Sequence, residues 1–122
     1  MLDHVAIRVS DYGQARAFYD LALTPLGLRR LVTSDNSAGY GDQRPYFFIQ
    51  QDGPAAIFGH VAFVAADNAS VDAFYAAALA AGARDDEAPG LRPYAAGYYA
   101  AAVLDLDGYS IEAVRRAPAL SG

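Results

Sequence analysis

Residues 3–11 read DHVAIRVSD, and the same pattern returns 56 positions later as GHVAFVAAD. In both copies the tripeptide AFY follows at the same interval. Nine of twenty positions are identical between residues 4–23 and residues 60–79, without a gap. The chain contains two histidines, His4 and His60, and both occupy the same position in the repeat. We therefore infer a duplicated structural unit that carries a paired site.

The composition is that of a compact globular chain. Of its 122 residues, 54% are hydrophobic and 19% are charged, and this length suits one domain. We expect residues 1–122 to form a single domain of two modules, at about 1–52 and 58–116. No apolar run reaches the ~18 residues of a membrane span. The first strand follows Met1 too closely for a signal peptide, so we expect a cytoplasmic protein without membrane contact.

Net charge and missing residue types exclude several functions. The net charge of -5 argues against a nucleic-acid partner, because nucleic acids bind clustered positive charge. Cysteine is absent, which excludes disulfides, thiolate metal ligands and cysteine nucleophiles. All nine basic residues are arginine, which excludes Schiff-base lysines and the lysine of a phosphate-binding P-loop.

The first half predicts a strand, a helix and three further strands. The first strand alternates between an apolar core face and a mixed face that carries His4 and Arg8. Asp11 is the predicted N-cap of a helix whose apolar stripe extends to Leu26. Three short strands then follow between residues 28 and 51.

The second half repeats this order. Asp67 is its predicted N-cap, and Glu112 is predicted to leave the Ile111 face of the last strand for the opposite one. The predicted elements are a strand at 59–65, a helix at 68–81, a strand from 83 followed by a loop at 87–90, and strands at 98–105 and 109–115.

These patterns predict an α+β fold. Two tandem βαβββ modules would form a curved eight-stranded mixed sheet with helices on the outer face and a hollow inside. The alternation within each first strand turns His4 and His60 toward that hollow.

The sequence resembles the vicinal oxygen chelate superfamily, which includes glyoxalase I, bleomycin-resistance proteins and extradiol dioxygenases. The resemblance is carried by the two strand motifs with their AFY tripeptides, and by DLDGYSIEAV at residues 105–114. This last segment is similar to the family's Asp-Pro-Asp-Gly turn and final strand, with Leu106 at the proline position. Together the motifs span nearly the whole chain and are specific to the fold rather than to one reaction.

The resemblance implies a divalent metal ion, either Fe, Mn, Zn or Ni, held by His4, His60 and Glu112. The superfamily places one ligand on the first strand of each unit and an acidic ligand on the last strand. The first unit offers no acid of its own, because its last strand reads YFFIQ at residues 46–50. A three-ligand site is therefore expected rather than the four-ligand site of glyoxalase I.

Further side chains are expected to border the hollow. Arg8 would meet a substrate carboxylate or oxyanion, or else form a salt bridge with a neighbouring acid. Glu112 and Arg8 are the candidate catalytic residues. The expected substrate-binding residues are Arg8, Tyr46, Phe48, Tyr94, Tyr98 and Tyr99.

Two functions remain open from the sequence. The first is a metal-dependent enzyme of lyase, isomerase or dioxygenase type that chelates neighbouring oxygens of a small substrate. The alternative is a metal-free protein that sequesters a small molecule or drug, as bleomycin-resistance proteins do. The resemblance also implies a homodimer, in which His4 and His60 could meet within one chain or across two.

Overall fold

The protein is described from a computed structural model, which describes residues 2–54 and 59–117. The boundary between the two predicted modules, at residues 52–58, falls partly outside the described residues. Residues 118–122 also lie outside them. Within the described part of the chain, no helix is long and apolar enough to cross a membrane.

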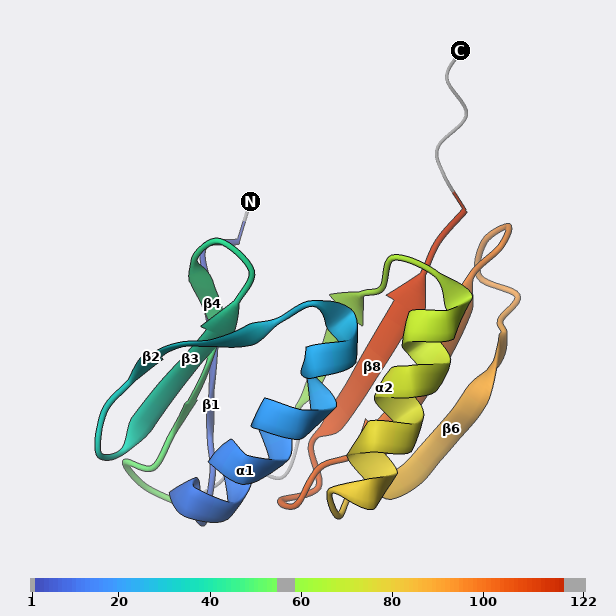
Figure 1. Cartoon of the computed structure of the whole chain (residues 1–122). Helices are drawn as coiled ribbons and strands as arrows, with labels where there is room; N and C mark the ends of the chain where they lie inside the picture. Colours follow the sequence, from blue (N-terminus) through green and yellow to red (C-terminus); the bar gives the residue numbers. More distant parts are fainter. Residues whose placement is uncertain (1, 55–58, 118–122) are drawn as a thin grey trace.

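Each module has the order βαβββ (Figure 1). The elements of the first module are β1 (Val5–Arg8), α1 (Tyr12–Ala22), the 3-10 helix η1 (Thr24–Leu26), β2 (Arg29–Thr33), β3 (Ser37–Gly41) and β4 (Pro45–Gln50). Those of the second are β5 (His60–Val64), α2 (Asn68–Ala80), β6 (Arg84–Leu91), β7 (Tyr99–Leu104) and β8 (Ser110–Arg115).

The eight strands form two mixed four-stranded sheets, ordered β1-β4-β3-β2 and β5-β8-β7-β6. The first and last strands of each module pair in parallel, and the other neighbours are antiparallel. In Figure 1 the two helices lie side by side and cover the same side of the sheets. The predicted α+β class, with tandem βαβββ modules and outer helices, is confirmed.

Both helices begin at the predicted caps. The Asp11 carboxylate accepts a hydrogen bond from the Gln14 backbone N–H (3.0 Å), and Asp67 accepts one from Ser70 (2.7 Å). The first helix ends earlier than its apolar stripe suggests: α1 stops at Ala22 and the chain continues as η1. Pro25 lies within η1, where it has no N–H to continue an α-helical ladder.

The predicted loop at residues 87–90 is wrong, because β6 continues through it to Leu91. Pro89 is tolerated there since β6 is an edge strand, whose outer side needs no backbone donor. The register of β6 against β7 shifts twice along this segment, between Asp85 and Glu87 and again between Glu87 and Gly90.

One apolar core joins the two modules beneath the helices. The rings of Phe47 on β4 and Phe63 on β5 meet edge-on, with centroids 5.2 Å apart. Most buried side chains of both modules belong to one contiguous cluster, which also includes Val9, Ile49 and Ile111, each 0% exposed. A small second cluster is formed by Tyr98, Ala100 and Val114. The core therefore lies on the helix side of both sheets, and the opposite sides remain for a site.

Candidate functional site

Each sheet has a face that its helix does not cover, which we call the open face of that module. In the second module, β5 and β8 run parallel with His60 opposite Ser110 and Ala62 opposite Glu112. His60 and Glu112 therefore project from the same face of neighbouring strands, while Ile111 is fully buried on the other. The predicted orientation of Glu112 away from the Ile111 face agrees with this register.

Both side chains are held by hydrogen bonds from their own module. The Nδ1 atom of His60 lies 2.9 Å from the Ser110 hydroxyl, which in turn donates to Asp86 (3.1 Å). The Tyr98 hydroxyl donates to Glu112 Oε1 at 3.2 Å. Tyr98 is 8% exposed, and its burial, together with the charge of Glu112, raises its pKa. Tyr98 therefore remains a proton donor at neutral pH.

The same strand pair in the first module carries a different residue. There Ala6 lies opposite Phe48, as Ala62 lies opposite Glu112. Phe48 thus occupies the position of the acid, and its ring packs edge-on against the imidazole of His4 with centroids 5.6 Å apart. The first module therefore lacks a carboxylate at this position, as the sequence predicted.

His4 is oriented by its neighbour in sequence. Its Nδ1 atom lies 2.8 Å from the Asp3 carboxylate, which can only accept, so Nδ1 carries the proton. In the neutral imidazole, Nε2 then holds the free lone pair. This hydrogen bond, followed by the nearby charge of Arg44, lowers the pKa of Asp3.

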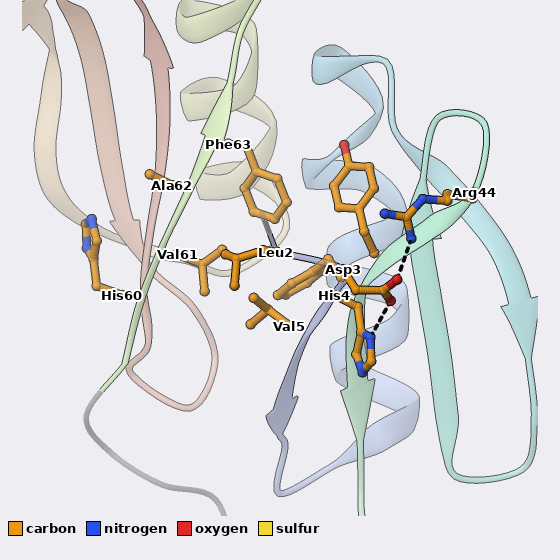
Figure 2. Close-up of a pocket in the computed structure, with 11 residues that line it drawn as sticks. Leu2, Asp3, His4, Val5, Arg44, His60, Val61, Ala62 and Phe63 are labelled. Atoms are coloured by element: carbon orange, nitrogen blue, oxygen red, sulfur yellow. Dashed lines mark hydrogen bonds and ion pairs between the residues drawn. The ribbon is translucent and has the colours of Figure 1, made fainter.

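A pocket of ≈ 370 Å³ lies between the two modules and is bordered by both histidines. Figure 2 shows the imidazoles on opposite sides of it, with the apolar side chains of Leu2, Val5 and Val61 between them. The remaining lining residues are Asp3, Arg44, Tyr46, Phe47, Ala62 and Phe63.

The three predicted metal ligands do not meet within one chain. Among residues 2–54 and 59–117, no group of three His, Cys, Asp or Glu side chains could hold a metal ion. His60 and Glu112 share an open face, and their imidazole and carboxylate groups suit Fe, Mn or Zn. His4 belongs to the other module, so a single chain offers two of the three donors together.

The other predicted site residues do not form one cluster. Arg8 projects from β1 and pairs with Asp52 (3.1 Å), which is the salt-bridge alternative. Tyr46 lines the pocket between the modules. Tyr94 is 69% exposed and packs edge-on against Tyr98.

The expected place of Tyr99 beside the hollow is wrong. Its hydroxyl donates to Asp72 on α2 at 2.6 Å, which places Tyr99 on the helix side of the sheet. Because neighbouring strand residues point to opposite faces, Tyr98 and Tyr99 cannot both border the open face. Four polar residues of the site were absent from the prediction: Asp3, Arg44, Asp86 and Ser110. Strand parity with Glu112 could have indicated Ser110.

Known proteins share both the sequence pattern and the fold of this chain. The model of the glyoxalase/bleomycin resistance protein/dioxygenase superfamily matches residues 1–113. The chain has no significant match among curated proteins. A glyoxalase/bleomycin resistance protein from Albidiferax ferrireducens T118 is 31% identical, with a TM-score of 0.86, over 96% of this chain and 99% of the other.

Two more distant structures share the fold. Lactoylglutathione lyase from Agrobacterium tumefaciens is 21% identical with a TM-score of 0.69, over 94% of this chain and 92% of the other. TioX from Micromonospora sp. ML1 is also 21% identical, with a TM-score of 0.66, over 97% and 98%. The family match and the repeated βαβββ architecture agree, and the chain belongs to the glyoxalase/bleomycin resistance protein/dioxygenase superfamily.

Proposed function

We propose that the protein is a divalent-metal-dependent enzyme acting on a small molecule with two neighbouring oxygens. His60 and Glu112 of one copy would hold the ion together with His4 of a second copy. The observation that carries the proposal is the pairing of His60 and Glu112 on one open face. Of the donors expected from the sequence, only His4 is missing from this face.

The surface supports a second copy as the source of His4. β1 and β5, which carry the two histidine motifs, are both edge strands with one hydrogen-bonded neighbour in the described sheets. Unpaired edge strands are templates for association with another chain. Leu2 beside β1 is 79% exposed and Val64 on β5 is 83% exposed, so apolar surface lies at both edges. A homodimer that joins these edges would cover both.

The side chains around the pair suit acid–base chemistry. When bound, a divalent ion would supply a Lewis acid for the neighbouring oxygens of the substrate. Tyr98 keeps its proton at neutral pH, and its hydroxyl can donate to a substrate oxygen when its hydrogen bond to Glu112 is exchanged for one to the substrate. Held oxygens and a proton donor suit lyase and isomerase reactions, and a dioxygenase reaction would in addition consume dioxygen.

A second candidate function is metal-free sequestration of an apolar small molecule. It is favoured by the pocket between the modules, whose wall between the two histidines is formed by Leu2, Val5 and Val61. Apolar pockets of about 300–1,000 Å³ are typical of small-molecule sites. In this alternative both imidazoles would serve as hydrogen-bonding groups at the rim.

Metal analysis of the protein purified without a His tag or chelator separates the two functions. The proposal expects about one metal ion per chain, and expects that this ion is lost in His4→Ala, His60→Ala and Glu112→Ala. Gln50→Ala is the matched control, because Gln50 is bound to Asp52 and is not a proposed ligand. Metal-free protein that binds apolar ligands, with unchanged binding in Glu112→Ala, would favour sequestration.

Mixing two inactive variants tests whether the site spans two copies. A dimer of His4→Ala with His60→Ala contains one intact site only if the ligands come from both chains. After mixing, about a quarter of wild-type metal binding should return, because half of the dimers are mixed and each has one intact site. No recovery in subunits shown to exchange would contradict a site shared between two copies.

A further inference from the structure

A β-bulge on β6 turns Asp86 and Glu87, two consecutive acids, toward the open face of the second module. Asp85 lies opposite Val103, whereas Glu87 lies opposite Ala102, so Asp86 is the extra residue between them. Asp85 remains on the helix side, where its carboxylate accepts from Tyr75 on α2 (2.9 Å). Bulges re-aim side chains in this way and are frequent beside active sites.

The Asp86 carboxylate reaches across β7 to Ser110 on β8, which contacts His60 on β5. Ser110 has a single hydroxyl proton, and an ionised carboxylate can only accept. The hydroxyl must therefore donate to Asp86 at 3.1 Å. It then has only an acceptor to offer at the 2.9 Å contact with His60 Nδ1, so Nδ1 must carry the proton.

We propose that Asp86, acting through Ser110, is a positioning residue that fixes the proton of His60 on Nδ1 and presents its Nε2 lone pair on the open face. The effect of this tautomer on metal binding rests on the proposed function. The position of the proton follows from the hydrogen bonds alone. A histidine ligand is commonly oriented by a hydrogen bond from its other ring nitrogen. His4 is held in the same tautomer by a direct hydrogen bond to Asp3, whereas His60 is held through Ser110.

The proton position can be measured in the metal-free protein by ¹⁵N NMR of the imidazoles at a pH where they are neutral. A His4→Gln background leaves His60 as the only histidine. The proposal expects a protonated Nδ1 and an unprotonated Nε2. An unconstrained imidazole in water favours the opposite tautomer, so His60 carrying its proton on Nε2 would overturn the proposal.

Variants test the connection to Asp86. Ser110→Ala removes the oxygen that accepts from His60 Nδ1. In Asp86→Asn the new amide can donate to the Ser110 oxygen, which leaves the Ser110 hydroxyl proton free to be donated to His60. Both should shift His60 toward the Nε2–H tautomer, and Ser110→Thr should retain the wild-type state. Glu87→Gln is the matched control, since it removes the same charge from the same strand but its partner is Arg92. Because the amide oxygen in Asp86→Asn can still accept from Ser110, the decisive variant is Ser110→Ala, which removes the acceptor at His60 Nδ1. An unchanged tautomer in Ser110→Ala contradicts the proposal.

Zn²⁺ titration separates this inference from the proposed function. Asp86→Asn should bind Zn²⁺ about 10–100-fold more weakly than wild type, with Glu87→Gln unchanged. Wild-type protein with the Nδ1–H tautomer but without Zn²⁺ binding would overturn the proposed function and leave the positioning of His60 standing. Zn²⁺ binding with the Nε2–H tautomer would overturn the positioning alone.

Discussion

Asp105 is the buried charged side chain of the described residues, and it lies where the two modules meet, 4% exposed. Its carboxylate accepts from the Tyr19 hydroxyl (2.5 Å) and from the backbone N–H groups of Asp107 and Tyr109 (2.9 Å each). Burial raises the pKa of Asp105, although these hydrogen bonds act in the opposite direction. Its charge therefore opposes folding at neutral pH.

This arrangement predicts a pH-dependent difference between wild type and Asp105→Asn. Because the folded pKa of Asp105 is raised, its contribution to the free energy of unfolding is complete below the unfolded pKa of about 4. That contribution decreases as pH rises through the folded pKa. Urea denaturation at several pH values should show wild type losing stability relative to the variant as pH rises above about 4. A relative gain would mean that the folded pKa is lowered.

Residue placement could be predicted where a strand is regular. The alternation of Ile111 with Glu112 predicted which face carries the acid, and the register agrees. The same alternation allows only one of Tyr98 and Tyr99 to border the open face, and the structure places Tyr99 on the helix side. Asp86 could not be predicted, since a bulge reverses the parity that follows it and leaves no clear signal in one sequence.

At the scale of elements, the start of α1 depends on one side chain. The Asp11 carboxylate caps the Gln14 backbone N–H, one of the donors that the first turn leaves without a helical partner. Asp11→Ala should lower the free energy of unfolding by about 1 kcal/mol, measured by urea denaturation. Asp11→Asn retains a capping oxygen and should lose little. Equal losses in the two variants would contradict a capping role.

The order of elements could be predicted from periodicity, but the end of α1 and the extent of β6 could not. The apolar stripe continues past Ala22 into η1, so hydrophobic spacing alone does not mark the end of α1. Likewise, Pro89 and Gly90 indicated a loop because their local propensities oppose a strand. Pairing with β7 overrides those propensities at the sheet edge, where Pro89 needs no hydrogen-bonded N–H.

At the scale of the whole molecule, the shared core predicts one cooperative unfolding transition. Circular dichroism and tyrosine fluorescence should give coincident melting curves. Phe63→Ala, which removes a ring packed between the modules, should cost about 3–5 kcal/mol and keep the transition single. Leu21→Ala is the control, because Leu21 is 60% exposed. Two separated transitions would show that the modules unfold independently.

The arrangement of the two modules was beyond the reach of the sequence pattern. Alternation predicts which face of a strand His4 and His60 occupy, but it does not say how one sheet is placed against the other. That placement depends on contacts between residues far apart in the chain, such as Phe47 with Phe63. The repeat therefore predicted a paired site, while the separation of its two histidines required coordinates.

The contacts between the modules also constrain the order of events during synthesis. The Tyr19–Asp105, Ser10–Asp107 and Tyr109–Arg8 hydrogen bonds join positions 86, 97 and 101 residues apart. Synthesis must pass Asp105 before any of them can form. Until the second module folds, α1 covers Phe47 from within the N-terminal half, but the packing of Phe63 against that ring is missing. Apolar surface between the modules is therefore exposed to aggregation during synthesis.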